Sequence, residues 1–120
     1  MTIAADITKI EEITAACKRV EDTYGTVDVL INSAGNIIRK HFLDVQPEDY
    51  DTVMNLNARG LYFMTQGIAR LMAKQNKGKI VNVASLNTFI ALSTVSIYAA
   101  SKGAVGQMTK AIVISLKLCE

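Results

Sequence analysis

The 120-residue sequence is poor in the residues that form covalent or metal cross-links. It has two cysteines, Cys17 and Cys119, and one histidine, His41. Two distant cysteines and one histidine are too few for a zinc cage, so we expect no disulfide and no metal site, and we interpret His41 as an ordinary loop residue. The composition therefore excludes a disulfide-rich or metal-stapled domain.

Strong charge and long apolar runs are also missing. The net charge is only +2, and we interpret the one basic cluster, at Lys74, Lys77 and Lys79, as a solvated loop rather than a phosphate track. No apolar run approaches the roughly 20 residues that span a bilayer, and no signal peptide is recognisable. We expect a cytoplasmic protein without a membrane or nucleic-acid partner.

The length and the apolar content suit one modest core. Half of the residues are apolar and a fifth are charged, without repeats or linkers, so we expect a single domain over residues 1–120. Thr8 and Glu11 are spaced as a capping box, and we expect a bend in the long second helix near Asn57. The pattern predicts helices over 10–24, 47–75 and 98–116 and buried parallel strands over 27–33 and 79–84.

Tyr98 and Lys102 are four residues apart on the last predicted helix, thirteen residues or more after Ser85. Residues at this spacing share a helix face, so the ammonium can lie against the phenol. A phenol has an ordinary pKa of about 10, and a nearby cation favours its charged form and brings it toward the range useful for proton transfer. Ser85 offers a hydroxyl that can hold a substrate oxygen. By itself the Tyr–Lys spacing also arises by chance.

Two further polar features lie upstream. The strand over 27–33 ends in a turn from Asn32 to Gly35, whose small residues let backbone approach a ligand closely. Asn57 falls within an apolar helical stripe, and a buried amide must find partners, from a ligand site or simply from backbone at a helix break. Ligands gather at the carboxyl ends of strands in open α/β sheets, so the turn and Ser85 are expected along one edge.

These residues, in this order, resemble the short-chain dehydrogenases and reductases, which carry an Asn-Asn-Ala-Gly turn, an Asn, a Ser and a Tyr-x-x-x-Lys. The resemblance implies an α/β fold with a Rossmann-like, doubly wound parallel sheet. Asn55 is a rival for the catalytic Asn, but the family pattern Asn-x-x-Gly fits Asn57. The implied catalytic residues are Asn57, Ser85, Tyr98 and Lys102.

The same resemblance implies NAD or NADP as the cofactor. Ser33 stands where the family usually has Asn, which keeps a small hydrogen-bonding group. In the family the Lys also bonds the nicotinamide ribose, and the Asn holds a water that links this Lys to solvent. The implied cofactor-binding residues are Asp6, Asn32, Ala34, Gly35, Tyr98 and Lys102.

The chain departs from the family pattern at both ends. None of its seven glycines forms G-x-x-x-G-x-G or G-x-G-x-x-G, the loop whose backbone N–H groups face a pyrophosphate. The start resembles the end of the family's third strand, and the end follows the helix with Tyr98 and Lys102. We therefore expect a partial sheet that lacks the N-terminal glycine-rich βαβ unit and the C-terminal strands.

The stretches 34–40 and 98–105 look most like gluconate and deoxygluconate dehydrogenases, although polyol dehydrogenases and ketoacyl carrier-protein reductases share much of the pattern. The implied reaction is reversible hydride transfer on a small alcohol or ketone such as a sugar acid or polyol. Arg39 or Lys40 then meets a carboxylate, unless both belong to a solvated basic loop.

The family also implies a homo-oligomer, a dimer or a tetramer, formed through its long helices. The alternative function comes from another class. In that alternative the chain is a catalytically inactive, truncated fragment that acts only as an assembly or dimerisation unit, and the missing phosphate loop is the feature that favours it.

Overall fold

The computed structural model describes residues 1–117 and contains two compact units. Unit 1 comprises Met1–Ser33 and Arg59–Val83, and unit 2 comprises Ala34–Ala58 and Ala84–Glu120, of which residues up to 117 are described. Cys119 lies outside the described residues. The single domain over 1–120 stays a prediction.

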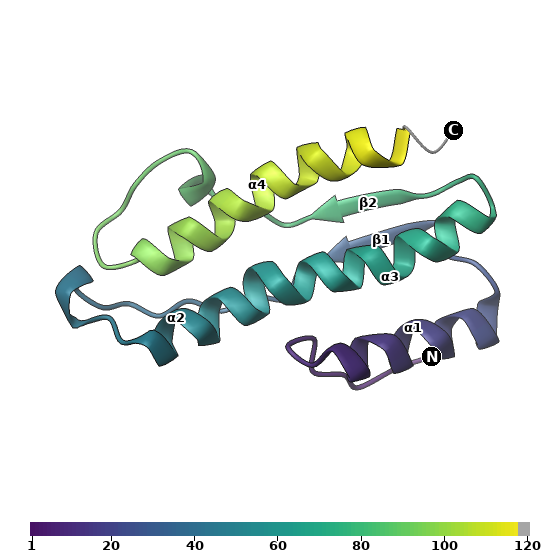
Figure 1. Ribbon diagram of the computed structural model, residues 1–120, viewed down its shortest axis with the longest axis horizontal. Helices are drawn as coiled ribbons and strands as arrows, with labels where there is room; N and C mark the ends of the chain where they lie inside the picture. Colours follow the sequence, from purple (N-terminus) through teal and green to yellow (C-terminus); the bar gives the residue numbers. More distant parts are fainter. Residues whose placement is uncertain (118–120) are drawn as a thin grey trace. The chain divides into compact units, whose positions relative to one another are not determined.

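Unit 1 contains a two-stranded parallel sheet (Figure 1). Strand β1 (Val29–Asn32) pairs with β2 (Lys79–Asn82) in a register that sets the first residues of the two strands opposite each other and, at the other end, Asn32 opposite Asn82. Parallel strands need a long crossover, and the one between them contains helix α3 (Leu61–Lys74). The α/β class with a partial Rossmann-like sheet is therefore confirmed, with strands shorter than predicted.

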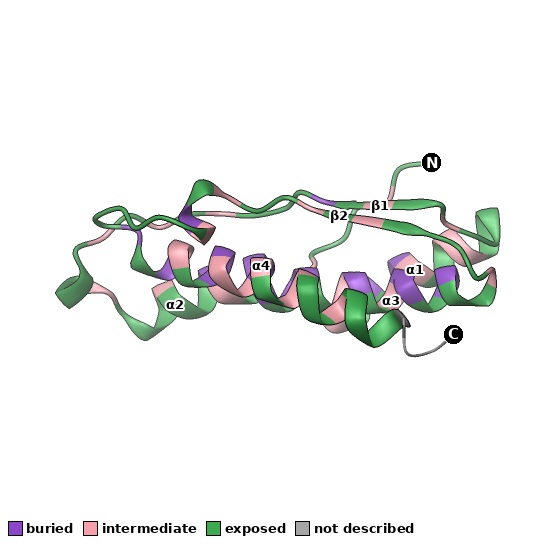
Figure 2. Cartoon of the chain, turned by 90° about the horizontal axis from the view of Figure 1, so that it is seen from above, coloured by how far each residue is buried: buried purple, intermediate pink, exposed green. Residues whose placement is uncertain are grey.

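One face of this sheet is covered by α3 and by helix α1 (Ile10–Tyr24), whose buried residues lie toward the strands (Figure 2). Ile68, Leu71 and Met72 form the core, against which partly buried apolar side chains pack. The opposite face is open within unit 1. It exposes the apolar side chains of Val29, Ile31, Val81 and Val83.

The predicted capping box of α1 is wrong. The N-cap of the helix is Lys9, without a side-chain cap, and Thr8 instead donates its hydroxyl and its N–H to the Asp6 carboxylate. The hydroxyl is engaged before the helix begins, so Glu11 has no capping partner there, and it is Glu12 that reaches back to the Asp6 N–H. The predicted helix end is confirmed, since Gly25 adopts a left-handed φ of 73°.

The long helix predicted over 47–75 is present in three pieces. Helix α2 (Pro47–Met54) begins with proline and an acidic first turn, and α3 ends the run. Between them Asn55–Gly60 is a π-helical stretch. A π-helical stretch adds a residue to the turn and often lies at a functional site, and this one contains Asn57, where the sequence predicts a bend.

Helix α4 (Ser96–Lys117) packs against α2 and against the short 3₁₀ turn Leu86–Thr88 in unit 2. The approach of that turn is close, because a Cβ atom at position 106 would lie 2.6 Å from Cγ2 of Thr88. Gly106 therefore belongs to the contact. Toward its end α4 exposes Val113, Ile114 and Leu116, and self-association through this face stays a prediction.

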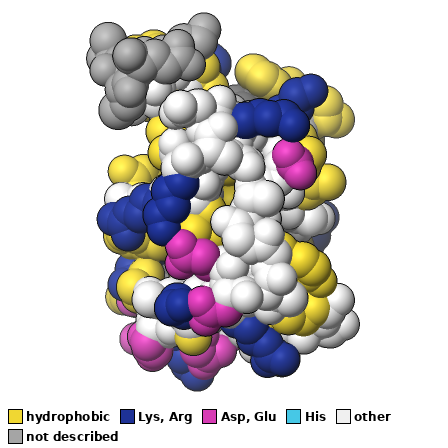
Figure 3. Space-filling view, turned by 90° about the vertical axis from the view of Figure 1, so that its right-hand side faces the viewer, with side chains coloured by type: hydrophobic (Ala, Val, Ile, Leu, Met, Phe, Trp, Pro, Cys, Tyr) yellow, Lys and Arg dark blue, Asp and Glu magenta, His cyan; other side chains and the backbone are white. Residues whose placement is uncertain are grey.

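The predicted basic loop carries acidic partners. The Lys74 Nζ lies 2.5 Å from Oε1 of Glu21, and the Lys77 Nζ lies 3.3 Å from Oδ1 of Asp28. Figure 3 likewise shows lysine and arginine side chains among acidic and apolar ones on the face it displays. Within residues 1–117, the helices are too short or too polar to cross a bilayer.

Candidate functional site

The Asn57 amide makes three hydrogen bonds within unit 2. It is fully buried, whereas the rival Asn55 is exposed. Its Oδ1 accepts the Asn36 N–H at 2.8 Å, and its Nδ2 donates to the Asn36 carbonyl at 2.8 Å and to the Ser101 hydroxyl at 3.0 Å. Both amide donors are thereby used, so any water held by Asn57 has the second lone pair of Oδ1 or the backbone carbonyl to bind.

Tyr98 and Lys102 meet on the first turns of α4, as their spacing predicts. The Lys102 Nζ lies 5.8 Å from the centroid of the Tyr98 ring, and the lysine is only 5% exposed. A Cβ atom at position 35 would lie 3.8 Å from this Nζ and 3.2 Å from Oδ1 of Asn57. The turn at Gly35, the amide and the ammonium therefore share one small space, which a larger residue at position 35 would crowd.

Ser85 is placed by the 3₁₀ turn that follows it. Its Oγ accepts the Asn87 N–H at 3.2 Å, which leaves the hydroxyl proton available for donation. Thr88, the last residue of that turn, donates its hydroxyl to the Lys102 carbonyl at 3.1 Å. This bond holds the turn against α4. Within residues 1–117 no hydrogen bond joins the Ser85 hydroxyl to the Tyr98 phenol.

The loop before α4 is held to the segment after Gly35. Thr94 has a φ of 63°, which is strained for a β-branched residue, and its carbonyl accepts the Lys40 N–H at 2.9 Å. The Lys40 ammonium lies 2.6 Å from Asp49 and holds the pKa of that carboxyl below its ordinary value. Arg39, in contrast, is exposed and has no ion pair among the described residues.

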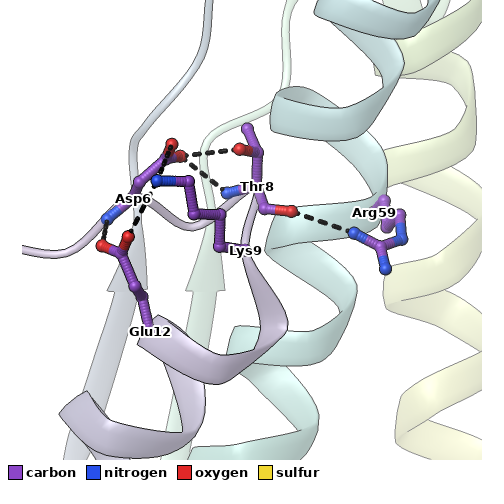
Figure 4. A network of polar contacts seen from close by, with 5 residues as sticks. All are labelled: Asp6, Thr8, Lys9, Glu12 and Arg59. Carbon is purple, nitrogen blue, oxygen red and sulfur yellow. Dashed lines mark hydrogen bonds and ion pairs between the residues drawn. The ribbon is translucent and has the colours of Figure 1, made fainter.

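Asp6 belongs to unit 1 and takes part in a local network (Figure 4). The Thr8 N–H and hydroxyl donate to its Oδ1 at 3.0 and 2.8 Å, and these bonds hold the pKa of Asp6 below its ordinary value. Arg59 donates to the Thr8 carbonyl at 3.0 Å, which ties this loop to the end of the π-helical stretch that precedes α3. The other carboxylate oxygen of Asp6 lies 3.9 Å from the Lys9 ammonium and remains exposed.

Asn32 also belongs to unit 1, and its side chain is buried at the end of β1. Its Nδ2 donates to Oγ1 of Thr65 at 2.9 Å and to Oδ1 of Asn82 at 2.8 Å. These bonds join the ends of both strands to α3. Ala34, which begins unit 2, is exposed.

The structure thus brings Gly35, Asn57, Tyr98 and Lys102 together within unit 2, with Ser85 at the start of a turn fastened to the same helix. The contacts of Asp6 and Asn32 lie within unit 1. Sequence reasoning missed Ser101, although its place between Tyr98 and Lys102 was a signal. It also missed Asn36, whose buried Oδ1 has no hydrogen-bond partner among the described residues and whose backbone holds Asn57. Residues 1–117 contain no cluster of metal-ligating side chains.

Comparison with known proteins gives consistent matches. The family model of short chain dehydrogenases matches residues 1–117. The 2-dehydro-3-deoxy-D-gluconate 5-dehydrogenase of Escherichia coli is 39% identical over 111 residues, which cover 92% of this chain and 44% of that protein. An oxidoreductase of Staphylococcus aureus is 30% identical over 110 residues, covering 92% of this chain and 48% of its own.

Among solved structures, a gluconate 5-dehydrogenase from Burkholderia cenocepacia in complex with NADP and tartrate matches with a TM-score of 0.89 at 33% identity. The match covers 92% of this chain and 43% of that one. The chain therefore spans a little under half the length of the relatives it matches.

Proposed function

The chain belongs to the short-chain dehydrogenase family, and we propose that it serves in an NADP- or NAD-dependent oxidoreductase that interconverts the alcohol and ketone of a sugar acid or similar small molecule. The observation that carries this proposal is the buried Lys102 ammonium beside the Tyr98 ring, next to the Gly35 turn. Lysine is seldom buried without a specific reason, and here its ammonium lies beside an aromatic ring whose hydroxyl can carry a proton. The family match supports catalysis over a purely structural assembly fragment.

In the proposed mechanism, Tyr98 carries the proton and Ser85 holds the reacting oxygen. In alcohol oxidation the Tyr98 phenolate takes the hydroxyl proton, and in ketone reduction the phenol returns it. The Ser85 hydroxyl, whose proton is not used by the Asn87 contact, donates to the reacting oxygen and stabilises its developing charge. When bound, the nicotinamide supplies the acceptor or the donor of the hydride.

The residues around Gly35 fit a ribose. Ala34 and Gly35 present nothing larger than a methyl group to a sugar, and Asn36, next to them in the sequence, has a buried Oδ1 acceptor without a hydrogen-bond partner among the described residues. Lys102 supplies ammonium donors for ribose hydroxyls. We extend the proposal to Asp6, whose outer carboxylate oxygen is exposed and suits the adenine edge, and to Asn32, which would act through the backbone of its turn because its Nδ2 is already engaged.

For the substrate carboxylate we favour Arg39 over Lys40. The Lys40 ammonium is already paired with Asp49, whereas the exposed Arg39 guanidinium offers the planar fork that binds carboxylates in a bidentate way. The related enzymes named for gluconate and deoxygluconate support an acid of this kind. Replacing Arg39 by Met is thus expected to raise the KM for a sugar acid and leave that for a neutral polyol unchanged.

The replacement Tyr98→Phe tests the proposed function most directly. We expect turnover of gluconate-type substrates with NADP or NAD, followed by nicotinamide absorbance, to fall at least about 100-fold, because the proton carrier is lost. The assay uses the full-length protein. Tyr50→Phe is the matched control, since Tyr50 is an exposed tyrosine of the same unit. Equal rates for the two variants would refute the role of Tyr98.

A further inference from the structure

Ser101 is a fully buried hydroxyl between the two proposed catalytic residues of α4. It donates to the carbonyl of Tyr98 at 2.8 Å and accepts the Asn57 amide at 3.0 Å. The first bond is common for serine inside a helix, where the hydroxyl bonds a carbonyl of the preceding turn. The second bond links α4 to a residue far away in the sequence.

A second serine of α4 shows which of these two bonds is unusual. Ser115 also donates to a carbonyl of its own helix, that of Ala111, at 2.9 Å, but its residue is exposed. Ser101, in contrast, is buried and accepts a bond from Asn57, a residue outside α4, and its own helix requires neither feature. A buried polar pair has a strict geometry, because each partner is already out of water and is left without a hydrogen bond if the other moves.

We propose that Ser101 is a positioning residue, which sets the place of Tyr98 and Lys102 relative to the turn after Gly35. It acts through Asn57, whose amide is bonded at its other side to the backbone N–H and carbonyl of Asn36. The three bonds of that amide form a bridge from the turn after Gly35 to α4. This inference rests on the proposed function, because it assigns the bridge a purpose in the reaction.

The test is a double-mutant cycle in the full-length protein, with kcat as the measured quantity. A net hydrogen bond contributes about 1 kcal/mol, so we expect Ser101→Ala to lower kcat about fivefold with KM nearly unchanged. Asn57→Ala is expected to lower kcat further, and the double variant no further than Asn57→Ala alone, because Ser101 acts only through that amide. Ser101→Thr keeps the hydroxyl and should restore most of the rate.

Ser115→Ala is the matched control, the same substitution on the same helix, and its kcat should equal that of the unaltered protein. If Ser101→Ala lowers only the melting temperature and leaves kcat unchanged, or if the losses of the two single variants multiply, the positioning role is wrong. Measuring Tyr98→Phe in the same assay separates a failure of the proposed function from a failure of the positioning role of Ser101. If Tyr98→Phe abolishes turnover while Ser101→Ala does not affect it, only this inference falls; if Tyr98→Phe is fully active, the proposed function falls and this inference with it.

Discussion

The two units of the chain bury different kinds of side chain. Unit 1 buries large apolar residues of α3, Ile68, Leu71 and Met72, against α1 and the sheet. Unit 2 buries mostly smaller apolar residues, together with several polar ones. Among its described residues, the buried polar side chains are Asn57, Asn87, Ser101 and Lys102.

Apolar and polar burial contribute differently to the two units: the first stabilises the fold, and the second fixes the relative positions of side chains. Apolar burial is non-directional and stabilises any well-packed arrangement, so unit 1 needs only the right volume in the right place. A buried amide, hydroxyl or ammonium requires a partner at a fixed distance and angle, so unit 2 pays for its specificity with narrow tolerance. The candidate catalytic side chains lie in the unit whose buried contacts are directional.

The largest effect on stability is expected in the apolar core of unit 1. Ile68→Ala removes a side chain that is 5% exposed and leaves a cavity, which should lower the free energy of unfolding by about 2–5 kcal/mol. Urea denaturation followed by circular dichroism measures it. Ile114→Ala is the control, because Ile114 is 63% exposed, and it should change the free energy by under about 0.5 kcal/mol. Similar losses in both variants would contradict the contrast between the units.

Apolar periodicity was enough to predict the elements that form this core. Residues such as Ile13 on α1 and Ile68 on α3 recur at helical spacing, and the strand pattern indicates β1 and β2, because burial of one face follows from spacing alone. The strand ends were less well predicted. A strand ends where its hydrogen bonds to the neighbouring strand end. The sequence of one strand alone does not show where its neighbour ends.

Polar contacts were predicted less completely. The sequence placed Tyr98 against Lys102, since both lie on one helix, and it chose Asn57 over its neighbour. It missed Ser101, because a small residue in a helix rich in alanine and glycine is equally well explained by close packing. It misassigned the cap at Thr8, because a carboxylate two residues earlier competes for the same hydroxyl. Such bonds depend on three-dimensional competition that spacing does not encode.

A smaller effect is expected from the buried polar cluster around Asn32 in unit 1. Asn32→Ala removes two buried donors and leaves the oxygens of Thr65 and Asn82 without them, which should lower the free energy of unfolding by about 1–3 kcal/mol. The same urea titration measures it. Asn55→Ala, at an exposed asparagine, is the control. A loss no larger than that of the control would mean that directional contacts matter little in unit 1, which would sharpen the contrast with unit 2.

The smallest effect concerns the half-buried ion pair of unit 2, between Lys40 and Asp49. The Lys40 hydrogen bond is the main cause of the lowered pKa of Asp49, and the Gln46 N–H is the second. A lowered folded-state pKa contributes stability above the ordinary value of 3.8, and this contribution is lost as the pH falls through the folded-state pKa. Lys40→Met should therefore raise the pKa of Asp49 in a carboxyl carbon NMR titration, though not fully to its ordinary value, and weaken the acid dependence of stability. Lys110→Met, at an exposed lysine of α4, should leave the titration of Asp49 unchanged, and an equal shift in both variants would show that general charge, rather than this contact, sets the pKa.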